Sequence, residues 1–538
     1  MDSHKEAVIS ISKRLEQFYA QRQPFRVYHG TTNSTRTSDK SRSNTVDTSN
    51  LNHVLSIDQT KKTALVEPNV PMDQLVAAAL QNSLVPLVVM EFPGITVGGG
   101  FSGMAGESSS CRHGPFDSTV NWIEIVLASG ETLRASKTER PDLFWGAASA
   151  FGTLGVVTLL EVQLRDAKDL VELTHYPASS FAAASQKIQE EIADPAVEYV
   201  DAVAFSAQSF VICSGRLVDA VPDAKPRRYL RRQDPWFYLD VQKVAQKAKA
   251  KAKAEQKAVV HYIPLTDYLF RWDRGGFWVA RYAFRYFLTP FNRATRLLLD
   301  RFMRARVMYH ALHASGLSST YIIQDVGIPF PHSPAFHHFL DANLPTYPLW
   351  LCPVRARRDD PDSAHGLHAH FSSSHNNNNP DADPHPEFLL NFGIWGPAPP
   401  SRDPADLVRL NRSIEHRAHA LGGTKTLYAQ AFYTEAEFWA TYDRGAYDAV
   451  RAAYGASHLP SVYDKVKVKI DDDDGEVSRM PAALRRVRPF QGLYGVYKAW
   501  RGGEYLLRER GERKEKGEGK GQPAANKDTT VESATNGS

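Results

Sequence analysis

The sequence is poor in cysteine, nearly balanced in charge and free of long apolar runs. Its three cysteines are Cys111, Cys213 and Cys352, which lie far apart and match neither CxxC nor Cys/His spacing. A disulfide framework and a structural zinc site are therefore not expected, and a reducing compartment fits best. The net charge of +4 is too small for a dedicated nucleic-acid binder, which needs a concentrated basic surface. We expect neither a metal site nor a nucleic-acid partner.

The sequence also lacks the marks of a membrane span. It contains no run of about 18 uncharged apolar residues. The first residues, MDSHKEAVISISKRLEQFYAQRQ, carry charges throughout and lack the apolar core of a signal peptide. Within them Val8, Ile11, Leu15 and Phe18 recur at helical spacing, which predicts an amphipathic helix within residues 1–23.

A chain of 538 residues is expected to form two or three domains. Residues 24–168 alternate glycine-rich loops with short β-like runs at 64–66, 85–92, 122–128 and 156–164. A helix is predicted over PMDQLVAAALQ, because Pro71 stands at a position typical of a first helical turn. This alternation predicts a mixed α+β domain.

The densest signal lies in residues 93–114, PGITVGGGFSGMAGESSSCRHG, where seven of 22 residues are glycine. Glycine lets a backbone approach a ligand closely, and backbone N–H donors suit a pyrophosphate. Gly98–Gly103 matches the dinucleotide fingerprint GxGxxG, but no helix-like pattern follows it, as a Rossmann domain requires. A Rossmann domain and a purely structural glycine loop stand as alternatives to a phosphate-binding loop of another fold.

Two further loops favour another fold. Residues 26–35, RVYHGTTNST, are a strand-like run followed by small hydroxyl side chains, and GTLG at 152–155 precedes a β-branched strand. With GGxxxG…RHG at 98–114 and DLFW at 142–145, the sequence resembles the PCMH-type FAD-binding domain shared by vanillyl-alcohol oxidase and the aldonolactone oxidases. The resemblance covers about 24–165. It implies an α+β fold of two subdomains, in which three loops enclose one extended FAD.

The resemblance also assigns FAD contacts residue by residue. The loop Gly30–Ser34 is expected to wrap the pyrophosphate. The loop Gly98–Ser109 is expected to line the isoalloxazine and pyrophosphate, and Gly152–Val157 to contact the adenine side. Thr31 and Thr32 depart from glycines of the family. Asn33 stands where some relatives attach flavin through histidine, so non-covalent FAD is predicted. The expected cofactor-binding residues are Gly30, Thr31, Thr32, Asn33, Ser34, Gly98, Gly99, Gly100, Gly103, Gly106, Glu107, Ser108, Ser109, His113, Gly114, Gly152, Thr153, Gly155, Val156 and Val157.

The second half of the chain resembles the Δ24-sterol reductases, also called 24-dehydrocholesterol reductases. The blocks that carry this resemblance are DPWFY (234–238), HYIPLTDYLFRWDRGGFW (261–278), YPLWLCP (347–353), LLNFGIWG (389–396), LYAQAFYTEAEFW (427–439) and YGASHLPSVYDK (454–465). The resemblance implies a sterol substrate and NADPH as co-substrate. Animal and plant members typically carry an N-terminal anchor, and none is expected here.

This resemblance extends the domain prediction. A larger mixed α/β substrate domain is expected over 169–470, with surface insertions at 243–258 and 355–386. A C-terminal extension is expected over 471–501. The remaining residues, 502–538, are charged and poor in apolar side chains, which predicts disorder.

A sterol needs a long apolar cavity with few polar groups. Aromatic residues of the matching blocks are candidate walls, and ordinary core packing is the alternative for each of them: Phe270, Trp272, Phe277, Trp278, Trp350, Trp395, Phe432 and Trp439.

Reduction of an isolated alkene needs a positioned proton donor. Tyr428 is the first candidate; it lies in a strand-like LYAQAFY run, in which Tyr433 would face the opposite side. Glu107, in the flavin loop, is the second catalytic candidate, because burial raises the pKa of a carboxyl. A structural hydroxyl and a capping carboxylate are the respective alternatives, and His113 is expected to fix its loop.

Residues 276–310 combine basic and aromatic residues. Aromatic residues alternate there with arginines at 281, 285, 293, 296, 301, 304 and 306, and Pro290 is expected to split the stretch into two helices. Such a composition suits peripheral attachment to a membrane surface. We therefore expect an enzyme on the cytosolic face of the endoplasmic reticulum, with a cytoplasmic enzyme, whose helices here only cover the pocket, as the alternative.

The sequence thus predicts an FAD-dependent oxidoreductase that reduces the Δ24 double bond of a sterol with NADPH. One alternative is an FAD-dependent oxidase or dehydrogenase of another lipid or alcohol. The other is a non-catalytic, flavin-containing sterol-binding protein.

Overall fold

The N-terminal half is built on an antiparallel sheet. The computed structural model describes residues 2–29, 42–222, 224–250, 257–373, 386–399, 404–468 and 489–501. Helix α1 (Asp2–Ala20) is followed by a parallel pair, β1 (Arg26–Tyr28) and β2 (Thr45–Asp47). The first large sheet then has the order β3-β4-β8-β6-β7, with β5 paired to β8. Its strands are β3 (Val54–Asp58), β4 (Thr63–Val66), β5 (Leu84–Pro86), β6 (Val120–Leu127), β7 (Thr132–Ser136) and β8 (Gly155–Asp166).

Several local predictions for this half are confirmed. Helix α1 buries Ile11, Leu15 and Phe18 on one face, and α2 (Met72–Leu80) begins directly after Pro71. The predicted strand over 85–92 is wrong beyond β5. Pro86 ends that strand and Pro93 follows soon after, and neither residue carries an N–H group for a ladder.

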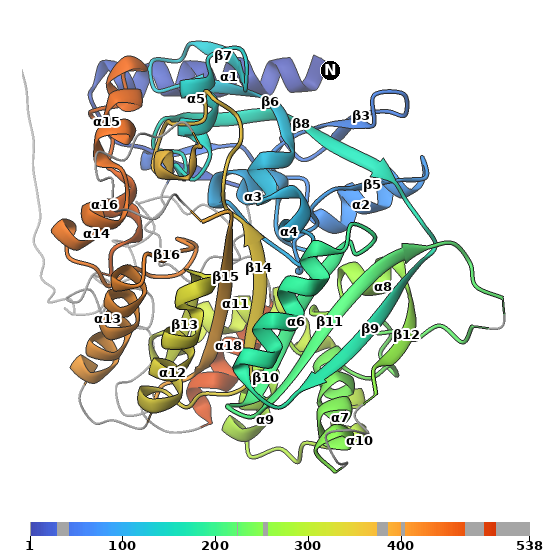
Figure 1. Ribbon diagram of the computed structural model, residues 1–538. Helices are drawn as coiled ribbons and strands as arrows, with labels where there is room; N and C mark the ends of the chain where they lie inside the picture. Colours follow the sequence, from blue (N-terminus) through green and yellow to red (C-terminus); the bar gives the residue numbers. More distant parts are fainter. Residues whose placement is uncertain are drawn as a thin grey trace, which may run out of the picture.

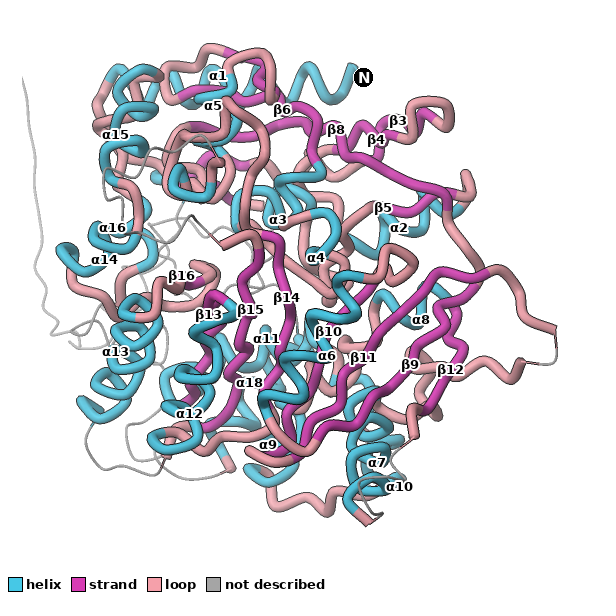
Figure 2. The backbone as a smooth tube through the Cα atoms, in the orientation of Figure 1, coloured by secondary structure: helices cyan, strands magenta, loops and turns pink. Residues whose placement is uncertain are grey.

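The second half forms an eight-stranded antiparallel sheet of order β12-β9-β11-β10-β14-β15-β13-β16. Figure 2 shows these strands crossing the lower part of the molecule side by side. They are β9 (Leu170–Ala178), β10 (Tyr199–Ser206), β11 (Ser209–Val218), β12 (Val259–Pro264), β13 (Tyr321–Pro329), β14 (Leu349–Arg355), β15 (Phe388–Pro397) and β16 (Thr424–Lys425).

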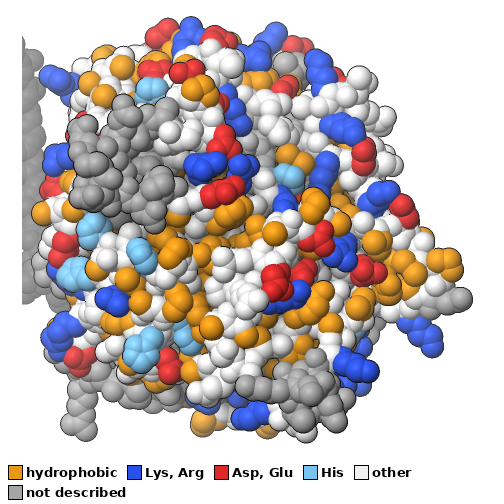
Figure 3. All heavy atoms as spheres, in the orientation of Figure 1, with side chains coloured by type: hydrophobic (Ala, Val, Ile, Leu, Met, Phe, Trp, Pro, Cys, Tyr) orange, Lys and Arg blue, Asp and Glu red, His pale blue; other side chains and the backbone are white. Residues whose placement is uncertain are grey.

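Helices cover both faces of this sheet (Figure 1). One face, toward the viewer, carries α6 (Phe181–Ala193), α12 (Ser333–Asn343) and α13 (Pro404–Ala420); the other carries α7 (Phe237–Lys249) and α9 (Val279–Tyr286). The surface over the viewed face mixes apolar and charged side chains of both signs (Figure 3). The other helices are α3 (Val97–Gly103), α4 (Ser110–His113), α5 (Pro141–Ala147), α8 (Leu265–Leu269), α10 (Arg293–Leu298), α11 (Ala305–Ser315), α14 (Glu435–Thr441), α15 (Arg444–Ala453), α16 (Val462–Val466) and α18 (Phe490–Arg501).

The alternation of side chains along β13, β14 and β15 divides the sheet into two faces. One set packs in a core with α6, α12 and α13 and includes Val326, Leu351 and Phe392. The opposite set lines a cavity against the N-terminal half: Ile323, Asp325, Gly327, Trp350, Cys352, Val354, Leu389, Asn391 and Trp395. The sheet therefore presents one face to a core and the other to a cavity.

The strand predicted for LYAQAFY is wrong. Only Thr424 and Lys425 pair with β13, and a turn follows at Leu427 and Tyr428. Glu415 and Lys425 are fully buried and paired, with Oε1 and Nζ 2.6 Å apart. Glu415 accepts the N–H of Phe432 and Lys425 donates to the carbonyl of Gln430, so these side chains replace a strand partner for the turn.

Two other segments differ in part from expectation. In the expected surface insertion 355–386, the residues described up to 373 are partly buried, since Arg358 pairs with buried Asp117 and Phe371 is 5% exposed. Residues 276–310 are split after α9, as predicted from Pro290, but a third helix, α11, begins at Ala305. Within the described residues, none of the helices is long and apolar enough to cross a bilayer.

Candidate active site

A cavity of about 560 Å³ lies where the two halves meet. Its walls come from the α3 loop, the 147–157 loop, the inner face of β13–β15, and helices α9, α11 and α18. Most of the lining surface is apolar, and Glu91, Asp325, Lys425 and Tyr428 are among its polar side chains. Such a cavity suits a large apolar ligand held by a small number of polar contacts.

The glycines of α3 serve two different purposes. A Cβ on Gly98 would lie 2.6 Å from Cβ of Pro68, and one on Gly100 would lie 2.3 Å from Cε of Met90, so protein packing requires both glycines. A Cβ on Gly103 would meet only the ring of Phe151, at 3.7 Å, and one on Gly99 only Oγ1 of Thr96. Since both of these residues line the cavity, their missing side chains leave room for a ligand.

Only some backbone N–H groups of the glycine-rich loops are available to bind a ligand. Gly98 donates to the carbonyl of Pro68 and Gly99 to the Thr96 hydroxyl, so the expectation of free donors is wrong for these two. Gly106 and Gly152 line the cavity, and their N–H groups have no acceptor among the residues the structure describes. Gly152 has φ +72°, a conformation that favours glycine. The two loops thus offer backbone donors to an anionic group.

The structure brings only some of the sequence-predicted site residues to the cavity. Those that line it are Gly98, Gly99, Gly103, Gly106, Gly152, Gly155, Val156, Val157 and Tyr428. Those that lie behind the lining are Gly100, Glu107, Ser108, Ser109, His113, Gly114 and Thr153. Gly30, Thr31, Thr32, Asn33 and Ser34 lie outside the described residues.

Glu107 faces the protein interior. Its carboxylate accepts from Arg271 at 2.9 Å, and the same guanidinium donates to Asp201 at 2.8 Å. Burial raises the pKa of Glu107, and the Arg271 guanidinium opposes that effect. His113 pairs at 2.8 Å with Glu198, the residue directly before β10, which anchors the end of the loop. These contacts support the glycine loop from behind.

A polar cluster stands on the opposite wall. Asp325 of β13 accepts hydrogen bonds from the Tyr428 hydroxyl, from Nδ2 of Asn391 at 2.7 Å and from Nε1 of Trp395 at 3.2 Å. The indole of Trp395 is also 3.1 Å from the Tyr428 oxygen. Gly393 faces Asp325 across the strands, and a Cβ there would lie 2.7 Å from the Trp395 ring. The missing side chain lets the indole lie across the strand and reach both oxygens.

Burial controls the protonation of this wall. It raises the pKa of Asp325 to about 6, against the opposing effect of the three hydrogen bonds. Burial, and then the Asp325 charge, raise the pKa of Tyr428 well above its usual value. Glu91 also faces the cavity, and burial raises its pKa to about 8. The cavity therefore holds carboxyl groups that can carry a proton near neutral pH.

Sequence reasoning missed Asp325 and Glu91. Asp325 could have been found as an acid at an inward position of an otherwise apolar strand, YIIQDVGIP. Glu91 is the single acid within the apolar run after β5. Of the candidate aromatic walls, Phe277, Trp350 and Trp395 line the cavity; the others, Phe270, Trp272, Trp278, Phe432 and Trp439, lie elsewhere.

Comparison with known proteins identifies relatives of this fold. The FAD binding domain family matches residues 6–136. Delta(24)-sterol reductase of Macaca fascicularis is 26% identical over 430 residues, which cover 78% of this chain and 76% of that protein. The proteins of the same name in Mus musculus and Pisum sativum are 27% and 26% identical, with the same shares covered.

This chain is a homologue of the Delta(24)-sterol reductases. The homology confirms the predicted resemblance, and the match to the FAD binding domain over residues 6–136 confirms the predicted α+β class. The residues present fit FAD, because the open faces of Gly99 and Gly103 leave space for a flat ring system. The N–H groups of Gly106 and Gly152 fit its pyrophosphate.

Proposed function

We propose that the protein is an FAD-dependent oxidoreductase that reduces the Δ24 side-chain double bond of a sterol, with NADPH as electron donor. One observation carries the proposal. A single apolar cavity joins the glycine cradle on one wall to the Asp325–Tyr428 cluster on the other. The homology to Delta(24)-sterol reductases supports the substrate class.

One set of residues would bind the cofactor, and another would supply the proton. Gly99, Gly103, Gly106 and Gly152 would hold FAD, whose reduced form supplies hydride equivalents. Trp350, Trp395 and the neighbouring apolar side chains exclude water from the alkene, which has no polar atom for recognition.

Tyr428 and Asp325 form the proton-donating pair in this proposal. When Asp325 is protonated, its O–H donates to the Tyr428 oxygen, and the Tyr428 O–H then points to an alkene carbon. As that proton leaves Tyr428 Oη, the Asp325 proton replaces it, so the net loss is one proton from Asp325. Asn391 and Trp395 fix the carboxyl in this geometry. Glu107, bound to Arg271 behind the lining, takes a supporting role.

Anaerobic spectroscopy separates the three candidate functions. Bleaching of bound flavin by NADPH, followed by recovery of the colour on adding a Δ24-sterol, is expected for the reductase. Recovery with oxygen and peroxide release, but not with the alkene, would indicate an oxidase of another lipid or alcohol. Flavin that NADPH does not bleach, in a protein that binds sterol tightly, would indicate a non-catalytic binding protein.

We also propose peripheral attachment to the cytosolic face of the endoplasmic reticulum through residues 276–310. Arg281 and Arg285 are exposed on α9, and each cation near an anionic surface contributes about 1 kcal/mol. Binding to anionic vesicles should weaken at high salt and in Arg281→Glu/Arg285→Glu. Binding that neither change affects would refute a role for this segment.

A further inference from the structure

Helix α18 carries an apolar stripe on its outer face. Phe490, Leu493, Tyr497 and Trp500 recur at spacings of three and four residues, so they lie on one side of the helix. Their exposed fractions are 49%, 49%, 48% and 65%. Large apolar side chains scattered singly on a surface are ordinary, but four on one stripe form a contiguous patch.

The opposite face of α18 is fixed against the protein by two glycines. A Cβ on Gly495 would lie 2.4 Å from the Ala311 carbonyl oxygen of α11, and one on Gly492 would lie 2.5 Å from the Tyr286 ring of α9. Gly492 and Val496 also line the cavity. The helix is therefore held in one orientation, with its inner face on the cavity and its outer stripe exposed.

The connection from α9 to α10 extends this patch. Phe287 and Tyr286 contact the Gly492 position, and the next residue, Leu288, is 90% exposed. Leu288 has φ 52°, a conformation that leucine rarely adopts. Leu298, at the end of α10, is 71% exposed. Leu288 is therefore an exposed apolar side chain beside α18.

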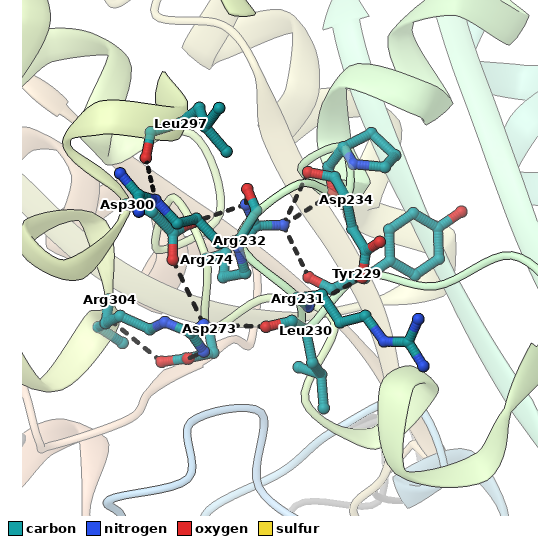
Figure 4. A network of polar contacts seen from close by, with 12 residues as sticks. Tyr229, Leu230, Arg231, Arg232, Asp234, Asp273, Arg274, Leu297, Asp300 and Arg304 are labelled. Carbon is teal, nitrogen blue, oxygen red and sulfur yellow. Dashed lines mark hydrogen bonds and ion pairs between the residues drawn. The ribbon is translucent and has the colours of Figure 1, made fainter. Parts of the chain in front are cut away.

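Polar contacts hold the far end of this surface on the protein body (Figure 4). Arg274 donates to Asp300 at 2.7 Å, Arg304 pairs with Asp273 at 3.0 Å, and Arg232 donates to the Leu297 carbonyl at 2.6 Å. Two ion pairs and one hydrogen bond to a carbonyl thus hold the segment from α10 to α11 in place. Arg304 is consequently not available to an outside partner.

Other arginines of α9, α10, the turn after α10 and α18 are exposed, and none of them pairs with a carboxylate of the described residues. In the described part of the chain no carboxylate forms an ion pair with Arg281, Arg285, Arg293, Arg301 or Arg501, all of which are exposed. Aromatic and aliphatic side chains among unpaired cations match the interface of an anionic bilayer, where rings sit at headgroup depth and cations meet phosphate.

We propose that α18, together with the α9–α10 connection, docks on an anionic phospholipid bilayer with the Phe490–Trp500 stripe in the interface. Docking places α18 between the bilayer and the cavity, whose wall includes Gly492 and Val496, so that an apolar substrate passes from lipid to cavity beside α18. The docking extends the peripheral attachment proposed above to α18, and the substrate route also rests on the proposed sterol reduction.

Sterol-free vesicles test the docking with the full-length protein. Phosphatidylcholine vesicles with phosphatidylserine should bind the wild type, and Leu493→Glu should weaken co-sedimentation at least about tenfold. Leu493 does not line the cavity, so the flavin content and its reduction by NADPH should be unchanged. Val260→Glu is the matched control, because Val260 is 46% exposed on the distant strand β12 and should bind as the wild type does.

Trp500 reports insertion directly. Brominated lipid should quench a fluorescence component that is absent from Trp500→Phe. The proposal is overturned if Leu493→Glu and Val260→Glu bind alike, or if binding does not need phosphatidylserine. It is also overturned if light scattering shows a wild-type dimer that Leu493→Glu dissociates, since the stripe would then cover a second copy.

Activity separates this proposal from the proposed function. With a Δ24-sterol dispersed in detergent, Leu493→Glu should reduce the alkene as fast as the wild type, whereas with sterol in vesicles it should be at least about tenfold slower. A wild type that binds vesicles through α18 but reduces no sterol would refute the proposed function alone. Equal rates for both proteins in vesicles would refute the substrate route beside α18.

Discussion

Replacing Tyr428 by phenylalanine tests the proton-donating pair most sharply. The change removes one hydroxyl from the cavity wall and leaves Asp325 with its bonds from Asn391 and Trp395. Tyr428→Phe should therefore slow alkene reduction by roughly 10²–10⁴-fold, the usual contribution of a positioned proton donor. Flavin reduction by NADPH should be nearly unchanged, because that half-reaction does not use the pair.

The same substitution should shift the pH dependence in a defined direction. The Tyr428 hydrogen bond stabilises the ionised carboxylate and so lowers the pKa of Asp325, which burial has raised to about 6. A hydrogen bond to a charged group contributes about 1.5–3 kcal/mol, and 1.36 kcal/mol corresponds to one pKa unit. Removing it should therefore raise the pKa of Asp325 by about 1–2 units.

Single-turnover rates across pH, with flavin reduced beforehand, measure both effects. Wild-type alkene reduction should decline as pH rises through about 6, where Asp325 loses its proton. The slower Tyr428→Phe reaction should decline about 1–2 units higher. Tyr433→Phe is the control, since Tyr433 is buried outside the cavity lining. An unshifted pH profile, or equal loss in both half-reactions, would refute the pair.

Three further changes test other parts of the site. Gly103→Val should abolish flavin retention, while the flavin-free protein should unfold at the wild-type temperature. Gly155→Val should instead destabilise the fold, since its Cβ would lie 2.4 Å from the Val126 carbonyl oxygen. Stoichiometric FAD in Gly103→Val would contradict a flavin site at Gly99 and Gly103. Acid precipitation should leave all flavin in the supernatant, because Asn33 cannot form the family's histidine link, and yellow colour in the pellet would count against this. Glu91 keeps its proton in the folded state up to about pH 8 but loses it near 4.5 in the unfolded state, so the stability of flavin-free protein should fall as pH rises between these values; urea unfolding of Glu91→Gln should lack that slope, and an identical slope would show that another group titrates.

Local patterns predicted the elements that form from nearby residues. The stripe of Ile11, Leu15 and Phe18 gave α1 its buried face, and the β-branched run after Gly155 became β8. Glycine spacing led to Gly99 and Gly103 at the cavity. These features depend on side chains within a few positions of one another, so their periodicity is visible in the chain.

Other features depend on contacts between distant residues. The LYAQAFY run has strand composition, but buried Glu415 and Lys425 satisfy its backbone and hold it as a turn. Glu107 sits in the flavin loop, yet Arg271, 164 positions away, draws its carboxylate inward. Asp325, Asn391 and Tyr428 meet only because β13, β15 and the turn after β16 are neighbours in the sheet. No local spacing encodes these encounters.

The most direct test of the central claim is product analysis after a single anaerobic turnover. Flavin-loaded protein, reduced with NADPH, is mixed with a Δ24-sterol, and the extracted sterol is analysed by mass spectrometry. The proposed function predicts a product whose side chain is saturated, with one hydrogen added to each former alkene carbon, in an amount that matches the bound flavin. A sterol recovered unchanged from fully reduced protein would contradict it.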